Sequence, residues 1–186
     1  MNSSLTWLDH IYLIKQKVCK TIGILKYVRN KLTQNVLKSI YYALVHPYYD
    51  YGNIVWATGD TVALHSLMKT QKRAIRIITS SQWNAHTRPM FIALRILQIT
   101  DIHKLQVACF MFKVQQGQIP KYFCDMFSTN SEFHSYATRH ANDYHIMYHR
   151  TSLLKNSIRI AGPLLWNTID HNIRVSTNIN IFKSTF

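Results

Sequence analysis

Four cationic side chains recur at helical spacing in the middle of the sequence: Lys69, Lys72, Arg73 and Arg76. At about 3.6 residues per turn, positions i, i+3, i+4 and i+7 form one stripe roughly 100° wide, the basic stripe. No carboxylate follows Asp60 within the predicted helix, so nothing local offsets the repulsion among these cations. The pattern favours contact with the phosphates of a polyanion, and a merely solvated face is the alternative interpretation.

Further cations run along the first predicted helix and beyond it: Lys15, Lys17, Lys20, Lys26, Arg29 and Lys31. Their spacing is less regular, so it fits solvation and nucleic-acid binding equally well. We select Lys15 and Lys20 from this set as candidate phosphate contacts. Trp83 lies in a polar break and is the candidate platform for stacking a base, whereas Trp56 and Trp166 have the apolar neighbours typical of a core.

The overall charge supports a polyanionic partner independently of the stripe. The 186 residues contain 22 Lys and Arg against 8 Asp and Glu, a net charge of +14 with a pI of about 9.9. Nucleic acid, RNA or DNA, is therefore the first expectation, and an anionic membrane surface is the second. Because 47% of the residues are hydrophobic and 12% are aromatic, the chain is expected to fold around a core.

Carboxylates are scarce in this sequence. Seven of the eight acids are Asp, Glu132 is the only Glu, and no two acids are adjacent. Two-metal phosphoryl transfer needs several converging acids, and paired-carboxylate hydrolysis needs two that face each other, so neither reaction has an obvious source of carboxylates. The sequence also contains no Gly-rich phosphate loop and no GxSxG motif. No catalytic residue and no cofactor are predicted.

Histidines gather in a polar stretch of the second half: His134, His140, His145 and His149. Metal ligation is one interpretation, but structural zinc sites use Cys or His pairs at tight spacing, and Cys124 stands alone. We therefore predict solvent-facing loop histidines and no metal. The three cysteines are odd in number and widely spaced, which favours reduced thiols in an intracellular compartment, cytoplasmic or nuclear.

The spacing of the apolar residues predicts a mainly α fold, and the helices of this fold must position the candidate residues. Helices are expected from a Thr6–Asp9 capping box to Val28, from Thr33 to the break at Pro47, from Asp60 or Thr61 to Ser80, over Pro89–Leu97, and from Thr100 or Asp101 to Gly117. The segment Tyr48–Gly52 is expected to be an aromatic connector. The last of these helices is apolar almost all round, which predicts a central, buried position.

The sequence changes character after residue 127. Residues 128–150 are polar and His-rich without a sustained period, and are expected to form a long loop. Beyond it we expect a strand over Thr151–Ala161, a turn at Gly162-Pro163, a short helix over Leu164–Ile169 and a final, truncated helix capped by Ser176. The predicted organisation is a helical bundle over 1–127, a loop over 128–150, and a smaller lobe over 151–186 that could hold a short strand or hairpin.

Eight stretches follow one another along the chain: Leu5–Ile11, Gly23–Arg29, Tyr42–Pro47 with Tyr51-Gly52 and Val55-Trp56, Gln71–Arg76, His86-Thr87 before Pro89, Gln118–Pro120, His134–Arg139 and Gly162–Asn167. Taken in this order, they resemble the region downstream of the catalytic palm in reverse transcriptases of non-LTR retrotransposons, LINE-like elements of the Jockey and CR1 type. The resemblance implies a thumb and the segment after it, which help to grip the template and primer duplex while the palm synthesises DNA.

In that family the palm carries a Tyr-x-Asp-Asp turn with two metal-binding acids. Here Tyr49-Asp50-Tyr51-Gly52 has one acid and lies at the thumb connector, so the resemblance implies gripping without catalysis by this chain alone. The expected function is that of a non-catalytic, thumb-like fragment of an RNA-directed DNA polymerase. Its expected partners are template and primer RNA or DNA and the palm of an intact element. An inert or regulatory protein-interaction relic of a decayed element is the alternative.

A membrane partner is not expected. No stretch reaches the roughly 18 uncharged apolar residues that a bilayer-spanning helix needs. The basic stripe also opposes an apolar face of ordinary core size and not one of membrane size.

Overall fold

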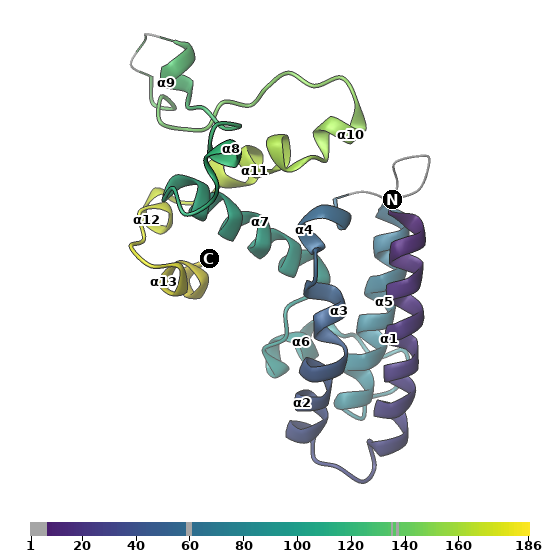
Figure 1. Ribbon diagram of the computed structural model, residues 1–186. Helices are drawn as coiled ribbons and strands as arrows, with labels where there is room; N and C mark the ends of the chain where they lie inside the picture. Colours follow the sequence, from purple (N-terminus) through teal and green to yellow (C-terminus); the bar gives the residue numbers. More distant parts are fainter. Residues whose placement is uncertain (1–6, 59–60, 135, 137) are drawn as a thin grey trace. The chain divides into compact units, whose positions relative to one another are not determined.

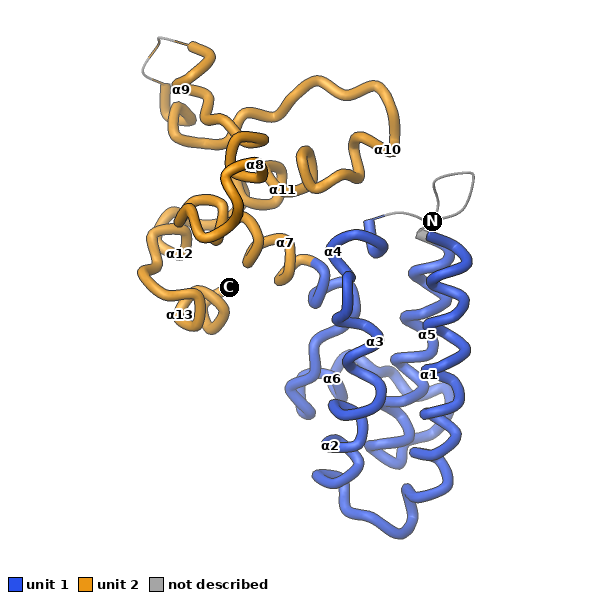
Figure 2. Tube along the Cα trace, in the orientation of Figure 1, with its two compact units in different colours: residues 1–103 blue, residues 104–186 orange. Residues whose placement is uncertain are grey.

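The computed structural model describes residues 7–58, 61–134, 136 and 138–186 (Figure 1). As predicted, the fold is mainly α-helical: the described residues form thirteen helical segments and one isolated antiparallel bridge, between Thr129 and Tyr144. The chain divides into two compact units, residues 1–103 and residues 104–186 (Figure 2). This division falls inside helix α7 (Ile99–Gln115), which differs from the boundary after residue 127 that the sequence suggested.

Unit 1 is a bundle of helices: α1 (Leu8–Val28), α2 (Gln34–Leu44), α3 (His46–Asp50), α4 (Asn53–Trp56), α5 (Thr61–Ile78) and α6 (Arg88–Leu94). Figure 1 shows α1 and α5 side by side and running in the same direction, with α2 running the opposite way. The predicted ends of α1 at Val28 and of α2 before Pro47 agree with the structure. Thr6 of the predicted capping box lies outside the described residues.

The core of unit 1 forms because α1 and α5 each bury one apolar face. On α1 the buried apolar side chains recur at steps of three and four residues: Ile11, Ile14, Val18, Ile22 and Leu25. On α5 they are Leu67, Ala74, Ile75, Ile77 and Ile78. Burial of each valine, leucine or isoleucine in this set contributes about 1.5–3 kcal/mol, so packing of these two faces is what holds the two helices together.

The segment Tyr48–Gly52, predicted to be a connector, is mostly helical. α2 ends at Leu44, before Pro47, and Pro47 lies in the first turn of α3, where a proline is tolerated because its missing N–H is not needed. Tyr49 is fully buried in α3, and its Oη lies 3.1 Å from Oγ1 of Thr70 on α5. Gly52 then separates α3 from α4 by adopting a positive φ of 63°, a conformation that glycine takes without strain.

A buried amide fixes the rotation of α5. Gln71 is fully buried, and its Nε2 donates to Oη of Tyr41 at 3.0 Å and to the carbonyl of Leu97 at 2.9 Å. Its Oε1 accepts from the N–H of Ile99, the first residue of α7, at 3.0 Å. α7 therefore receives its capping acceptor from α5, and the predicted caps, Thr100 and Asp101, lie inside its first turn. With Gln71 held inside the core, the basic stripe is turned away from it.

Unit 2 forms around the C-terminal part of α7 with six further helices: α8 (Lys121–Cys124), α9 (Asn130–Phe133), α10 (Ser152–Lys155), α11 (Ile158–Asn167), α12 (His171–Arg174) and α13 (Ile179–Thr185). Its core combines aliphatic and aromatic side chains, and the centroid of the Phe182 ring lies 5.0 Å from that of Phe112 and 5.6 Å from that of Trp166. α7 carries buried residues at both ends and in the middle, but it is only partly buried, because residues such as Leu105 and Phe110 are half-buried and Lys104 and Lys113 are exposed. The predicted buried position therefore holds for one face of this helix. Gly117 sets its end with a φ of 63° and an N–H donated to Val114.

The predicted strand over residues 151–161 is wrong, because α10 and the start of α11 occupy this stretch. Gly162 and Pro163 do not form a turn either, since both are buried inside α11. Pro163 removes one helical hydrogen bond, and burial of the same helix face at Ile160 and Trp166 offsets this loss. The short helix predicted to start at Leu164 is therefore the second half of α11.

Two smaller predictions for unit 2 also differ from the structure. The expected loop over residues 128–150 contains α9, which starts with a capping box between Thr129 and Glu132. The cap of α13 is Asn178 and not Ser176, because the Asn178 side chain accepts from the N–H of Asn180.

Candidate nucleic-acid interface

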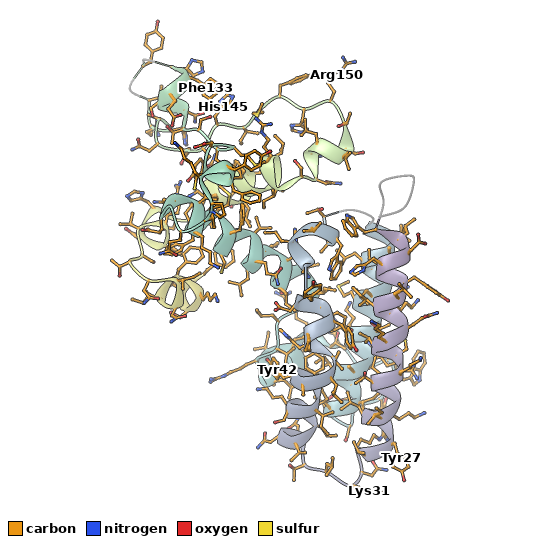
Figure 3. The ribbon with its side chains drawn as sticks, viewed as in Figure 1. Tyr27, Lys31, Tyr42, Phe133, His145 and Arg150 are labelled. Atoms are coloured by element: carbon orange, nitrogen blue, oxygen red, sulfur yellow. The ribbon has the colours of Figure 1, made fainter. Side chains whose placement is uncertain are left out.

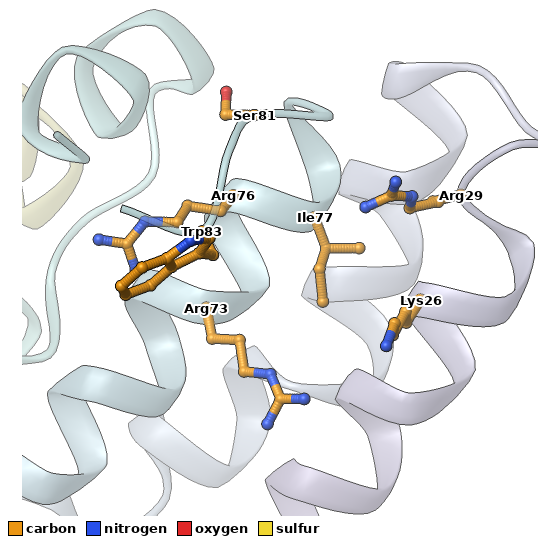
Figure 4. Close-up of a pocket in the computed structure, with 7 residues that line it drawn as sticks. All are labelled: Lys26, Arg29, Arg73, Arg76, Ile77, Ser81 and Trp83. Carbon is orange, nitrogen blue, oxygen red and sulfur yellow. The ribbon is translucent and has the colours of Figure 1, made fainter. Parts of the chain in front are cut away.

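An open groove lies at the C-terminal ends of α1 and α5, and cations from both helices line it (Figure 4). Its volume is about 420 Å³, and its lining residues are Lys26, Arg29, Arg73, Arg76, Ile77, Ser81 and Trp83. In Figure 4, Arg76 and Trp83 lie on one side of this basic groove, and Lys26 and Arg29 lie on the opposite side. The site therefore depends on the pairing of α1 with α5 and on the loop that follows α5.

The parallel packing of α1 and α5 brings their cations together. Near the start of both helices, Nζ of Lys15 donates to Oγ of Ser66 at 2.7 Å. Lys26 follows Lys15 by three turns of α1, so it lies on the same side of this helix, the side that faces α5. There it lines the groove together with Arg73 of α5. Cations near the last turn of a helix also offset the partial negative charge of its C-terminus, which stabilises each of these helices even without a ligand.

The cations of the basic groove have no carboxylate partner within the described part of the chain. No acid occurs between Asp9 and Asp50 or between Asp60 and Asp101, the two stretches that supply the groove. The ion pairs in the described residues join Asp143 to His140 and to Arg174, both in unit 2. Four neighbouring positive charges without a counter-charge form a region that attracts anions.

Arg76 does more than contribute charge to the groove. It is half-buried, and its Nε donates to the carbonyl of Ala85 at 2.9 Å. Ala85 closes a turn by donating its N–H to Gln82 at 3.1 Å, and Trp83 lies in that turn. Arg76 therefore holds in place the loop that presents Trp83, whose side chain is 86% exposed.

The structure brings together three of the seven candidates chosen from the sequence: Arg73, Arg76 and Trp83. Lys69 is exposed on α5 one turn before Arg73, and half-buried Lys72 does not line the groove. Lys15 lies at the other end of the helix pair, against Ser66. Lys20 follows Lys15 by five residues, which turns it about 140° around α1 and away from the groove.

Lys26 and Arg29 are the cationic groove residues that the candidate set left out, along with the uncharged Ile77 and Ser81. Both cations belong to the irregular run of cations in α1, from which Lys15 and Lys20 were chosen. Lys15 and Lys26 are eleven residues apart, a spacing that places both on one face of a helix. From this spacing the sequence could have indicated that Lys26 belongs with Lys15.

The histidines of unit 2 each have different neighbours. His140 Nδ1 lies 2.7 Å from Oδ2 of Asp143, and the His145 ring stacks on Phe133 with centroids 4.2 Å apart (Figure 3). His149 contacts the carbonyl of Met147. Across the ranges that the structure describes, no three His, Cys, Asp or Glu side chains are grouped in a way that could hold a metal ion.

Shifted pKa values occur at two buried tyrosines and a half-buried histidine of unit 1 and at Asp143 of unit 2. Burial raises the pKa of the Tyr41 and Tyr49 hydroxyls and lowers the pKa of His103. Partial burial would raise the pKa of Asp143, but hydrogen bonds from Arg174 and His140 hold it below its usual value. The groove is lined by four cationic side chains and an exposed indole, which suits anion binding.

Comparisons with known proteins gave no match: no protein-family model, no curated protein and no solved structure matches this chain. The resemblance to retrotransposon reverse transcriptases therefore rests on the sequence motifs alone. Among the described helices, none combines the length and the apolar character needed to cross a membrane.

Proposed function

We propose that this chain binds the phosphate backbone of RNA or DNA in the basic groove, as the thumb-like, non-catalytic part of a retrotransposon reverse transcriptase would. The observation that carries the proposal is the convergence of cations from α1 and α5 on one groove with no carboxylate partner among the described residues. The net charge of +14 supports the same conclusion, because it attracts nucleic acid at long range.

The cations act by neutralising phosphates. Arg29 and Arg73 can each offer a planar fork to phosphate oxygens, and Lys26, which lines the same groove, acts as a point charge. Phosphate contacts position a nucleic acid without reading its sequence, so little sequence preference is expected. Each contact releases counterions, which makes the affinity fall as salt rises.

The proposal includes no polymerase activity for the chain alone. Nucleotidyl transfer with two metal ions needs acids that converge on hard cations. The acids of unit 1 that the structure describes lie on three separate helices: Asp9 on α1, Asp50 on α3 and Asp101 on α7. Primer extension on an RNA template with Mg²⁺ or Mn²⁺ tests this part, and incorporation that one Asp substitution abolishes would contradict it.

The binding proposal is tested by the salt dependence of nucleic-acid affinity. The test variant carries Lys26→Gln, Arg29→Gln and Arg73→Gln, and leaves Arg76 in place because it also holds the Ala85 turn. If each of the three cations neutralises one phosphate, the slope of log K against log salt should drop by roughly 2 to 3. Circular dichroism verifies that the helices survive.

A matched control removes the same charge elsewhere. Lys121, Arg150 and Arg159 are exposed in unit 2 (Arg150 in Figure 3), and their change to Gln lowers the net charge by the same amount. The slope of this control should stay close to that of the wild-type chain. Equal slopes for both variants would show that the groove is only a solvated surface, and absence of all nucleic-acid binding would favour the protein-interaction relic.

A further inference from the structure

The indole of Trp83 is exposed to solvent, and the turn that carries it has a fixed conformation. The Trp83 side chain is 86% exposed, whereas Trp56 and Trp166 are each 2% exposed. The turn is fixed at both ends, because Ala85 N–H donates to Gln82 at 3.1 Å and Arg76 Nε donates to the Ala85 carbonyl at 2.9 Å. Tryptophan is enriched at binding interfaces, and this indole is held in a fixed position, so we treat it as a contact residue.

The surroundings of Trp83 indicate what the indole contacts. It lines the basic groove together with Lys26, Arg29, Arg73 and the apolar side chain of Ile77 (Figure 4). A flat aromatic ring beside a row of cations is the combination that binds single-stranded nucleic acid, where the ring stacks a base and the cations follow the backbone. In a duplex the bases are already stacked on one another, so the indole would have no free base face to cover.

We propose, building on the proposed function, that the basic groove takes an unpaired nucleotide of a single strand, with its base on the Trp83 indole and its flanking phosphates on Lys26, Arg29 and Arg73. The groove volume of about 420 Å³ lies within the roughly 300–1,000 Å³ of sites that enclose a small ligand, which suits one nucleotide. Arg76 serves as a positioning residue, since it orients the turn that carries the indole.

A membrane surface fits the same residues less well. An exposed tryptophan beside cations can also enter the headgroup region of an anionic bilayer. Membrane insertion, however, needs a continuous apolar face, and the chain neighbours of Trp83 are Gln82 and Asn84, both polar and exposed. The observations therefore favour a nucleic-acid strand, and vesicles become one arm of the test.

The experiment compares strands with and without bases. A short oligothymidylate, the same phosphate backbone with abasic sites, and a duplex of equal length are titrated while tryptophan emission is recorded. The oligothymidylate should bind about 5- to 150-fold more tightly than the abasic strand, the gain expected from stacking one base. It should also quench the emission of the exposed indole, while the duplex binds without this quenching.

Two leucine variants make the comparison specific. Trp83→Leu should bring the ratio of oligothymidylate to abasic affinity close to one and leave the salt slope unchanged. Tyr148→Leu is the matched control, because Tyr148 is also 86% exposed but lies outside the groove, and it should keep the full ratio. A Trp83→Leu protein that retains the wild-type ratio would overturn the proposal.

The outcomes separate this proposal from the proposed function. If salt-dependent binding persists but abasic strands and duplexes bind as tightly as the oligothymidylate, the stacking site is wrong and backbone binding stands. If no strand binds and the groove variant behaves like its control, both fail. If phosphatidylserine vesicles quench the tryptophan emission and no oligonucleotide does, both the stacking site and nucleic-acid binding are contradicted. The surface around Trp83 would then be a membrane-binding surface.

Discussion

The Nε–H of Arg76 donates to the backbone carbonyl of Ala85 at 2.9 Å, joining α5 to the turn that follows it. The turn carries the exposed Trp83, and its own closing bond runs from Ala85 N–H to Gln82. One arginine thus contributes charge to the basic groove and also sets where the indole lies. Its two roles can be separated, because a lysine keeps the charge but lacks the fixed, planar Nε–H.

Arg76→Lys should loosen the turn without changing the net charge. Loss of the Arg76–Ala85 bond is expected to lower the free energy of unfolding by about 0.5–1.5 kcal/mol and to speed hydrogen exchange at the Ala85 amide. Nucleic-acid affinity should fall as well. Arg73→Lys is the control, since Arg73 is exposed, and it should leave the Ala85 amide unaffected. Equal exchange rates in the two variants would show that the bond does not hold the turn.

Gln71→Leu tests the buried amide that fixes α5. The change orphans Oη of Tyr41, the carbonyl of Leu97 and the N–H of Ile99, all of which bond to Gln71. The bonds to Tyr41 and to Ile99 are buried, and a buried group without a partner costs about 1–3 kcal/mol, so a total loss of roughly 2–6 kcal/mol is expected. Urea unfolding measures it. Gln16→Leu, at an exposed position of α1, should change stability by less than about 0.5 kcal/mol, and a similar loss in both would refute the role of the network.

His103 should make unit 1 less stable in mild acid. Its Nδ1 lies 2.9 Å from Oδ1 of Asn53, whose Nδ2 donates to Tyr49, so Nδ1–H is the donor in this contact. Burial lowers the pKa of His103 below its ordinary 6.5 in the folded state. The unfolded chain therefore binds more protons just below pH 6.5, and the free energy of unfolding falls as the pH drops through that region. Stability at higher pH is retained, because the imidazole is then neutral in both states.

Urea unfolding across this pH range, on the wild-type chain and on His103→Gln, gives the measurement. The difference between the two curves should shrink as the pH falls below the ordinary histidine pKa, since only the wild-type chain carries the extra cost of protonating His103. A difference that stays constant with pH would mean that His103 keeps the same pKa in both states.

Local patterns in the sequence were enough to predict α1 and α5, because buried residues such as Val18 and Ile75 repeat at helical spacing. The basic stripe followed from the same periodicity. The groove did not, since it depends on α1 packing parallel to α5, and no local pattern in either helix specifies its partner. Lys26 and Arg29 were therefore two of many cations in the sequence, and only the pairing of the two helices places them beside Arg73.

At Gly162-Pro163 the local sequence pattern led to a wrong prediction. Both residues favour turns locally, yet they lie inside α11, because burial of its face in unit 2 outweighs their propensities. Gly162 is needed there for space. A Cβ added to it would come within 2.6 Å of Sδ and 3.4 Å of Cγ of Met111, a fully buried side chain of α7.

Gly162→Ala should therefore destabilise the protein, although alanine is the better helix former. Crowding of Met111 costs about 1–3 kcal/mol, and the gain in helix propensity returns up to about 1 kcal/mol. In a Met111→Ala background the crowding disappears, so the same Gly162→Ala change should become neutral or stabilising. Gly23→Ala is the matched control, because a Cβ on this exposed glycine of α1 meets nothing within 4 Å, and it should stabilise. Thermal or urea unfolding measures the stability of the four combinations of residues at positions 162 and 111. If Gly162→Ala lowers the free energy of unfolding equally with Met111 and with Met111→Ala, contact with Met111 is not what excludes a side chain from position 162.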